Sequence, residues 1–313
     1  MGIVLESGRG PAGCRGIQRR LMPMALHPLR ITHADTARHA AFLRYIPRVF
    51  PRLDFRPWYL RGGWTSTYEA FASVQADEIV ANVSVMRMRL LVGGREVRGA
   101  QLGAVGCVPE MRGRGLMRPL LERVFTQLHS EADLLLLYAN DGVLDFYPRF
   151  GFRRVRESVF ELGLALDPSP APAPRLDLDD PSQRAAWLSA CARSLPPTER
   201  FGVRDYGSVA LWHVCNLYPH DVYVLSEGDA FAVALQRGDV LHLLDLAAPR
   251  RFDLLPVLPR LIREPIARIR FGFCPELWCP MARVVEPIDD ALFIRGALAL
   301  PAEPFRFPML AQT

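Results

Sequence analysis

Lysine is absent from this chain of 313 residues, so all 38 basic residues are arginine, and they stand against 33 Asp and Glu. The arginines are scattered among the acidic residues and form no long basic run. Proteins that bind nucleic acid usually gather their basic residues on one face, so the composition argues against a nucleic-acid partner. The net charge of +5 still suits a small polyanionic ligand.

Cysteines and long apolar runs are also scarce. Six cysteines stand far apart, at Cys14, Cys107, Cys191, Cys215, Cys274 and Cys279. This sparse usage is typical of free thiols in a reducing cytoplasm. No set of close pairs has the spacing of zinc ligands, so we expect no metal site. No apolar run reaches the roughly 18 residues of a membrane-spanning helix, so we expect no membrane span.

The first 25 residues hold Gly, Arg and Pro and lack the apolar core of a secretory signal. We expect residues 1–25 to form a disordered tail. Met22 or Met24 could equally be the true start, because patterned sequence begins just after them. Together with the cysteine usage, these features favour a cytoplasmic protein.

The most informative stretch is an apolar run, residues 104–109, that ends in proline and precedes a turn rich in Gly and Arg. Apolar residues then recur from Leu116 to Leu128 at the spacing of one helix face, which predicts a strand, a turn and a helix. Backbone N–H groups at a helix start lack partners, and Gly113 and Gly115 leave the backbone open to an anion. The stretch predicts a phosphate site; the alternative is a capped helix with surface arginines.

Pro119 indicates where this helix starts. Proline inside a helix loses an N–H and clashes with the preceding turn, whereas the first turn tolerates it. We therefore expect the helix to begin near Gly115, with free amides from Arg114 to Met117.

The rest of the first half alternates between strands and helices. We expect strands at residues 29–32, 68–75, 79–91, 97–108, 134–139 and 153–162, and helices at 34–45 and 143–150. The apolar run 134–139 is predicted to be a buried strand parallel to the strand at Val105. It ends in a polar turn at Asn140 and Asp141, where α/β sheets place ligands. Gly151 is expected to close the short helix.

A proline-rich linker, residues 167–175, precedes a second half with a similar order of elements. We expect helices at 182–194 and 252–263, and strands at 222–225, 230–236, 240–246, 266–273 and 292–296. The turn after residue 246 contains proline and no glycine, so we expect no close approach of a pyrophosphate there.

Two motifs resemble the GNAT superfamily of N-acetyltransferases. The first is similar to its acetyl-CoA signature and reads Arg112-Gly113-Arg114-Gly115-Leu116-Met117. The second is similar to its Tyr-x-x-x-Gly-Phe motif and reads Phe146-Tyr147-Pro148-Arg149-Phe150-Gly151-Phe152. The first motif ends in Met instead of Gly or Ala, a departure shared by the enhanced-intracellular-survival (Eis-type) branch. Both motifs in this order favour that branch, without its C-terminal sterol-carrier-like domain.

The resemblance implies an α/β (α+β) fold made of tandem GNAT folds, with a mixed central sheet flanked by helices and a degenerate second copy. The expected domains are an acetyl-CoA-binding domain, residues 26–166, the linker 167–175, and a degenerate GNAT-like domain, residues 176–313. A loop at residues 46–67 carries several aromatics; they either pack as core or line the acceptor pocket, as this loop does in the family.

The resemblance also implies the residues that hold acetyl-CoA. The cofactor residues are expected to be Val105, Gly106, Cys107, Arg112, Gly113, Arg114, Gly115, Leu116, Met117, Arg118, Asn140 and Asp141. A backbone N–H at Val105–Cys107 would polarise the thioester carbonyl. Gly106 in a buried strand indicates either a bulge with close backbone approach or a packing glycine.

Tyr147 falls where the family places its general acid, and a phenol is protonated at neutral pH. The general base stays open. In the Eis-type branch it would be the terminal carboxylate of a third domain for which we expect no room here. The nearby carboxylates are Glu110, Asp141 and Asp145.

The sequence therefore predicts an acetyl-CoA-dependent N-acetyltransferase that acts on a small-molecule or peptide amine, with Tyr147 as general acid. It leaves open the amine, the acyl-chain preference and whether the protein forms a homo-oligomer. One rival is a non-catalytic acyl-CoA-binding sensor or pseudoenzyme, which would keep the turn without turnover. The other is a nucleic-acid binder, which requires clustered arginines.

Overall fold

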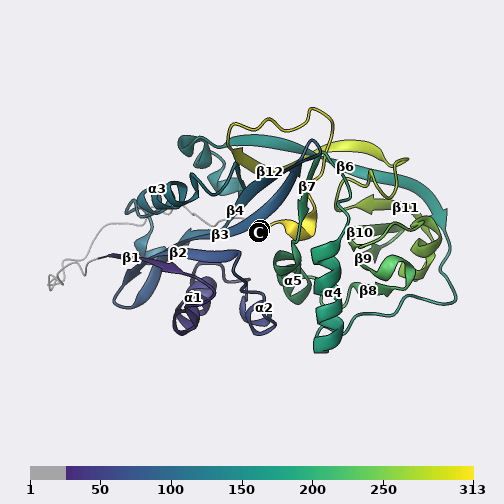
Figure 1. Ribbon diagram of the computed structural model, residues 1–313, viewed down its shortest axis with the longest axis horizontal. Helices are drawn as coiled ribbons and strands as arrows, with labels where there is room; N and C mark the ends of the chain where they lie inside the picture. The colour runs from purple at the N-terminus through teal and green to yellow at the C-terminus, as the bar shows by residue number, and fades with distance from the viewer. Residues whose placement is uncertain (1–25) are drawn as a thin grey trace, which may run out of the picture.

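The computed structural model describes residues 26–313, apart from the side chains of residues 228, 289 and 290; the expected tail, residues 1–25, lies outside them. Within the described part, twelve strands form one mixed sheet in the order β1-β2-β3-β4-β5-β12-β6-β11-β10-β9-β8, and β7 pairs with β3. The sheet runs across the whole length of the molecule and helices flank it (Figure 1). The expected class, a mixed sheet flanked by helices, is confirmed.

The first half supplies three α-helices and the strands at one end of the sheet. Its elements are β1 (His27–Ile31), α1 (Thr36–Val49), α2 (Arg56–Leu60), β2 (Tyr68–Gln75), β3 (Glu78–Val92), β4 (Arg95–Cys107), η1 (Pro109–Met111), α3 (Met117–Leu128), β5 (Leu134–Tyr138), η2 (Asp141–Val143), η3 (Tyr147–Phe150) and β6 (Arg153–Leu166). Strands β1 to β4 pair antiparallel, whereas β5 is parallel to β4, as expected.

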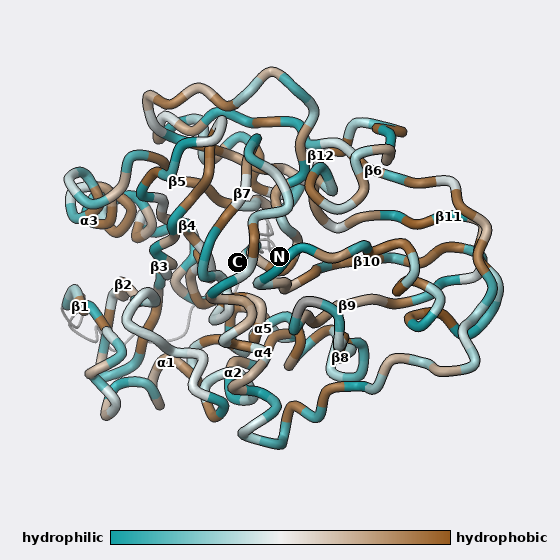
Figure 2. Tube along the Cα trace, turned by 45° about the vertical axis from the view of Figure 1, so that its right-hand side comes forward, coloured by the Kyte–Doolittle hydropathy of each residue, from teal (hydrophilic) through white to brown (hydrophobic). Residues whose placement is uncertain are grey.

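The second half supplies the other end of the sheet. Its elements are α4 (Pro181–Arg193), β7 (Phe201–Arg204), α5 (Gly207–Asn216), β8 (Val222–Leu225), η4 (Glu227–Asp229), β9 (Ala230–Arg237), β10 (Val240–Ala247), η5 (Leu255–Leu261), β11 (Ile266–Phe271), β12 (Arg283–Arg295) and η6 (Met309–Ala311). Hydrophobic segments gather along the strands of both halves, and hydrophilic segments follow the peripheral loops (Figure 2).

Two expected helix boundaries in the first half are wrong. Helix α1 runs through Pro47 to Val49 instead of stopping at Tyr45. Proline lacks an N–H, but Pro47 lies in the last turn, and Ile46 and Val49 hold that turn through their burial in the core. The segment 143–150 forms the short 3₁₀ turns η2 and η3 instead of a helix.

The expected helix at residues 252–263 is also wrong. Only the 3₁₀ segment η5, Leu255–Leu261, forms there. Pro256 and Pro259 remove two N–H donors, so an α-helical ladder cannot form. The prolines therefore overrode the apolar spacing that suggested a helix.

Helix α5 and strand β7 were not expected. Seven of the ten residues of α5 are buried, so the helix has no polar stripe by which a sequence pattern reveals it. The helix lies near the centre of the molecule, beside the described end of the chain (Figure 1). It therefore sits where the two halves meet.

Strand β6 was expected to be the last strand of the first half. Instead, β12 lies between β5 and β6 and pairs antiparallel with both. The other edge of β6 pairs antiparallel with β11. The halves consequently share one sheet, and the strand expected at residues 292–296 is only the end of a longer β12. The domain boundaries at residues 166 and 176 stay a prediction.

The proline-rich segment 167–175 packs against the second half. The Ser169 N–H donates to the Pro259 carbonyl over 2.8 Å, and the Ala173 N–H donates to the Arg260 carbonyl over 2.9 Å. The Pro174 carbonyl accepts from the Val224 N–H over 2.8 Å. The segment is thus held by residues of the second half of the chain.

The segment Ala311–Thr313 lies against the centre of the sheet. Gln101, fully buried on β4, donates from Nε2 to the Ala311 carbonyl over 2.8 Å and accepts the Thr313 N–H at Oε1 over 2.8 Å. His213 on α5 is 2.7 Å from the Gln312 carbonyl through Nε2, so Nε2 carries the proton and donates. These bonds fix the segment between β4 and α5.

His213 makes the stability of this arrangement dependent on pH. Burial lowers its pKa to about 4 from an ordinary 6.5. The folded state therefore disfavours the protonated ring, so the contribution of His213 is fully present above pH 6.5 and is lost as the pH falls toward 4. We expect the free energy of unfolding to fall by up to about 3 kcal/mol over this window.

Denaturant unfolding at a series of pH values measures this effect. A His213→Gln variant should lose most of the dependence, whereas His129→Gln, at an exposed position, should keep it. An unchanged slope in His213→Gln would assign the acid sensitivity to another group.

Candidate active site

The sheet opens between β4 and β5. Their parallel ladder runs from the Gly99–Leu134 pair to the Leu102–Leu137 pair, and β4 continues beyond it to Cys107. In the β3–β4 ladder, one residue of β3, Val83, faces two of β4, Ala104 and Val105, between the Asn82–Gly106 and Ser84–Gly103 pairs. One extra residue on β4 therefore makes a β-bulge at the point where the strands part.

The bulge is centred on Ala104, not on Gly106. Ala104 has φ +44°, an uncommon value for a residue with a Cβ. The fully buried Asn82 holds it by donating from Nδ2 to the Ala104 carbonyl over 3.0 Å. Gly106 is a packing glycine, because a Cβ there would lie 2.5 Å from Cγ1 of Val49. Of the two alternatives for Gly106, the structure therefore shows the packing glycine, and the bulge lies two residues earlier in the strand.

The glycine-rich turn follows this strand. Gly113 and Gly115 have φ values of +73° and +75°, and a Cβ at either position would meet nothing within 4 Å. These left-handed values cannot continue into a helix, so α3 begins at Met117, two residues after Gly115 and close to the expected start. Arg112 anchors the turn by donating from Nε to the Cys107 carbonyl over 3.4 Å.

A cavity with about 760 Å³ of empty space, counted with its opening to solvent, lies against this turn. Its lining includes the whole stretch from Arg112 to Arg118 together with Cys107, Phe146, Arg149 and Phe150. Four arginines thus surround exposed backbone at the start of α3, where the helix dipole is positive. Arg149 was missed by sequence reasoning, although it lies inside the second motif and could have been read from it.

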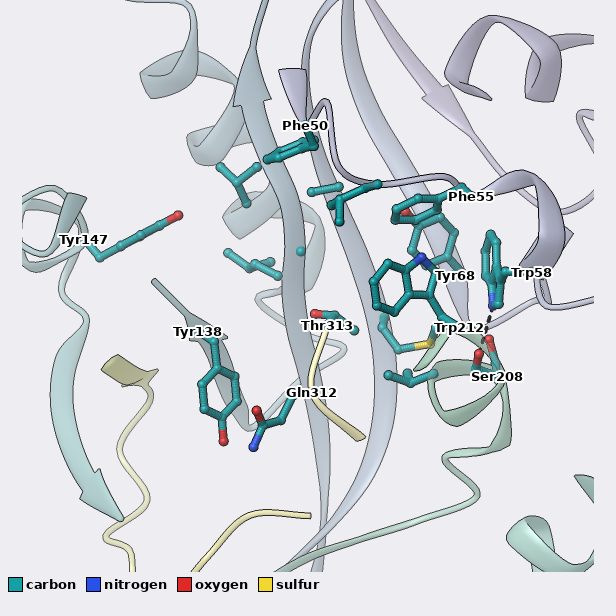
Figure 3. A pocket seen from close by; sticks show the side chains of 17 residues that line it. Phe50, Phe55, Trp58, Tyr68, Tyr138, Tyr147, Ser208, Trp212, Gln312 and Thr313 are labelled. Carbon is teal, nitrogen blue, oxygen red and sulfur yellow. Dashed lines mark hydrogen bonds between the residues drawn. The ribbon is translucent and has the colours of Figure 1, made fainter. Parts of the chain in front are cut away.

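A second cavity, with about 720 Å³ of empty space that includes its opening to solvent, lies where β4 and β5 part. Val105 and Tyr138 line it from these strands, and Phe55 and Trp58 line it from the α1–α2 region. Figure 3 shows Tyr147 and Tyr138 on one side, and Phe55, Tyr68, Trp58 and Trp212 gathered on the other. Both cavities border η3, since Tyr147 lines the second and Phe150 the first.

Tyr147 is fully buried, and its phenol oxygen has no hydrogen-bond partner among the described residues. Its ring contacts Phe146, Phe152 and Phe293 at centroid distances of 5.3 to 5.9 Å. Burial raises the pKa of Tyr147 well above its ordinary value. The residue therefore carries a proton at all working pH values and can offer it to a ligand in the cavity.

Some candidate residues lie outside both cavities. Asn140 precedes η2 and accepts the Val143 N–H at its carbonyl, and Asp141 is exposed. Of the other carboxylates, Asp145 is exposed and Glu110 forms an ion pair with Arg48. None of these four residues lines either cavity.

Helix α5 supplies residues that sequence reasoning missed, because the helix itself was missed. Ser208, Val209 and Trp212 line the second cavity. The Trp58 indole Nε1–H donates to the Ser208 carbonyl over 2.8 Å, and the Trp212 ring lies 5.8 Å from that of Phe55. The aromatic wall is therefore built across the seam between the halves.

Family comparison agrees with this geometry. Residues 31–155 match the model of the acetyltransferase (GNAT) domain. The chain has a GNAT acetyltransferase domain. This segment contains β4, the glycine-rich turn, α3, β5 and Tyr147, so the GNAT domain holds both motifs and the near walls of both cavities.

Several solved structures share the GNAT fold over most of the chain. A conserved protein of unknown function from Enterococcus faecalis, described as a probable N-acyltransferase, has a TM-score of 0.57 at 12% identity, covering 87% of this chain and 72% of that one. A GCN5-related N-acetyltransferase from Kribbella flavida has a TM-score of 0.55 at 17% identity, covering 87% and 71%. Eis1 from Mycobacterium abscessus has a TM-score of 0.54 at 16% identity, covering 87% and 73%.

No curated protein sequence matches this chain. At these identities the solved structures show the fold alone. Among the described residues, no helix is long and apolar enough to cross a membrane.

Proposed function

We propose that the protein is an N-acyltransferase that moves the acetyl group of acetyl-CoA to an amine. One observation carries this proposal: an arginine-lined turn with two open, left-handed glycines leads directly to a split in the sheet that holds the buried phenol of Tyr147. A turn of this kind suits a pyrophosphate, and the split gives a thioester a site shielded from water.

In this proposal the backbone amides from Gly113 to Arg118 hold the pyrophosphate. Arg112, Arg114 and Arg118 add positive charge, and Arg149 joins them from the opposite wall. Val105 lies within the bulge and lines the cavity, so we assign its N–H as the donor to the thioester carbonyl.

The chemistry requires one bond to form and one to break. The neutral amine attacks the thioester carbonyl carbon, a C–N bond forms, and the C–S bond breaks. The departing thiolate takes the phenol proton of Tyr147, and the ammonium nitrogen gives up a proton that restores the balance. Glu110, Asp141 and Asp145 lie outside the cavity, so none of them is placed to receive this proton, whereas the C-terminal residue Thr313 does line it.

Direct attack is favoured over a covalent acyl-cysteine. Cys107 is the cysteine beside the glycine-rich turn, and burial raises its pKa to about 11, with Arg112 partly opposing the shift. A thiol that is protonated at neutral pH is a poor nucleophile. The acetyl group therefore passes from CoA to the amine in a single step.

Calorimetric titration with acetyl-CoA, followed by an assay of free CoA thiol with an amine panel, tests the proposal. We expect saturable acetyl-CoA binding and amine-dependent release of thiol. Binding without release with any amine would support the sensor alternative. Absence of acetyl-CoA binding would contradict both the N-acyltransferase and the sensor.

A further inference from the structure

The cavity beside Tyr147 is walled by aromatic and aliphatic groups. Phe55, Trp58, Tyr68, Met86 and Trp212 form the wall opposite Tyr147, and all five are less than one-tenth exposed. Among the described residues that line the cavity, none has a charged side chain. Thr313, the last residue of the sequence, also lines the cavity, and its carboxyl group is the one acidic group among the described residues of the wall. It can compensate the charge of the reacting nitrogen, but a second cationic group on the acceptor would leave water without a counter-charge.

This composition separates two kinds of amine. A polyamine or aminoglycoside keeps several cationic groups beyond the reacting nitrogen, and burying each one unpaired is strongly unfavourable. An amine with an apolar body gains instead from burial, at roughly fourfold in affinity for each buried methylene group. Aromatic rings gain further from edge-to-face contact with Phe55 and Trp212.

The polar atoms of the wall further restrict which acceptors fit. The Trp58 indole N–H donates to the Ser208 carbonyl, whereas the Trp212 Nε1–H is buried without a hydrogen-bond partner among the described residues. An indole N–H can only donate, so a partner for Trp212 must bring an acceptor atom, such as a hydroxyl or carbonyl oxygen.

We propose that the acceptor is a primary amine with an apolar, preferably aromatic, body and no second cationic group, bound between α5 and the α1–α2 region. This inference rests on the proposed function and names its substrate class. The amine nitrogen lies toward Val105 and Tyr147, and the body lies against Trp58 and Trp212. An oxygen on the body pairs with the Trp212 indole.

The position of the cavity assigns it to the amine and not to a long acyl chain. The cofactor cavity and this cavity share no lining residue, although both border η3 and the end of β4. The far wall comes from Ser208, Val209 and Trp212 of the second half, and Figure 3 shows Ser208 and Trp212 on the side away from Tyr147. A long acyl chain would occupy the space that the amine needs.

The test compares acceptors with the native protein and acetyl-CoA. The probes are methylamine, hexylamine, 2-phenylethylamine, tyramine, spermidine and kanamycin. We expect kcat/KM to rise by about 100-fold or more from methylamine to 2-phenylethylamine, following the burial of apolar area. Spermidine and kanamycin should react at least tenfold more slowly than 2-phenylethylamine. Preferred transfer to the polycations would overturn the inference and leave the proposed function intact.

A matched pair of variants locates the effect. Trp212→Leu should raise the KM for 2-phenylethylamine about tenfold or more with little change in the KM for acetyl-CoA. Trp278→Leu is the control, since Trp278 is also 7% exposed with an unpartnered buried indole N–H but lies in the core of the second half. Equal effects in both variants, or none in either, would contradict the assigned wall.

A separate experiment tests whether the cavity holds a long acyl chain instead of the amine. Octanoyl-CoA in place of acetyl-CoA should slow transfer to 2-phenylethylamine, because the chain and the ring compete for one space. Faster transfer with octanoyl-CoA, indifferent to the amine, would assign the cavity to the acyl group. If acetyl-CoA binds and no probe reacts, calorimetric titration of 2-phenylethylamine into the protein with CoA decides, and absence of binding overturns the inference.

Discussion

Replacing Gly115 with glutamate should abolish acetyl-CoA binding, with a loss of affinity of about 100-fold or more. The new carboxylate would lie in the open space beside the start of α3, where the pyrophosphate is expected. Two like charges about 4 Å apart repel by roughly 4 kcal/mol at the effective dielectric of a protein surface. Calorimetric titration of native protein and Gly115→Glu with acetyl-CoA measures the difference.

The control must carry the same backbone strain. Gly238, in the β9–β10 turn, also has a left-handed φ, +57°, and open space around its Cα. Gly238→Glu therefore shares the conformational cost and the added charge but lies far from the cofactor cavity. Equal binding in native protein and Gly115→Glu would show that the turn is only the start of a helix.

Replacing Tyr147 with phenylalanine should lower kcat by about 100- to 10,000-fold, the usual range for loss of a general acid. The KM for acetyl-CoA should change little, because the phenol acts on the thiolate that forms in the reaction. The fold should survive, since the phenol oxygen has no partner among the described residues and its removal breaks no hydrogen bond. Steady-state kinetics and thermal unfolding measure the two effects.

Tyr223→Phe is the matched control, because Tyr223 is another buried tyrosine, on β8 in the second half. It should keep native kcat. A Tyr147→Phe variant with native kcat would remove the phenol from the mechanism and leave proton transfer to water. A fall in the melting temperature of Tyr147→Phe alone would indicate a structural role instead.

The strands and the cofactor turn could be predicted because their signals are local. The segment Tyr68–Gln75 alternates in polarity and was predicted at its observed bounds. Two closely spaced glycines indicate a turn with accessible backbone, and Gly113 and Gly115 both have left-handed φ values in the structure. Such features depend on a few neighbouring residues and little on the rest of the chain.

Features that depend on distant contacts could not be predicted in the same way. The insertion of β12 between β5 and β6 joins segments more than 100 residues apart, and no local pattern records it. Helix α5 is buried on nearly all sides, so it lacks the polar face that marks a helix in sequence. The segment Ala311–Thr313 lines the site and is held there by distant residues, Gln101 on β4 and His213 on α5.

The residues of the site likewise fall into those with a local sequence signal and those placed by distant contacts. The residues of the cofactor turn and Tyr147 are contained in two short motifs, so sequence reasoning found them. The acceptor wall needs Trp58 from one half and Trp212 from the other, placed together by the packing of α2 on α5. Asn82 is equally invisible in the sequence, although it holds the bulge that shapes the split.

A crystal structure of the protein with CoA would locate the cofactor relative to the turn and to Tyr147. We expect the pyrophosphate on the amides of Gly113 to Arg118, with Arg112 and Arg149 close to it. We also expect the CoA sulfur inside the split between β4 and β5, within hydrogen-bonding distance of the Tyr147 phenol oxygen. CoA bound elsewhere, or a sulfur that points away from Tyr147, would show that this site and this role of Tyr147 are wrong.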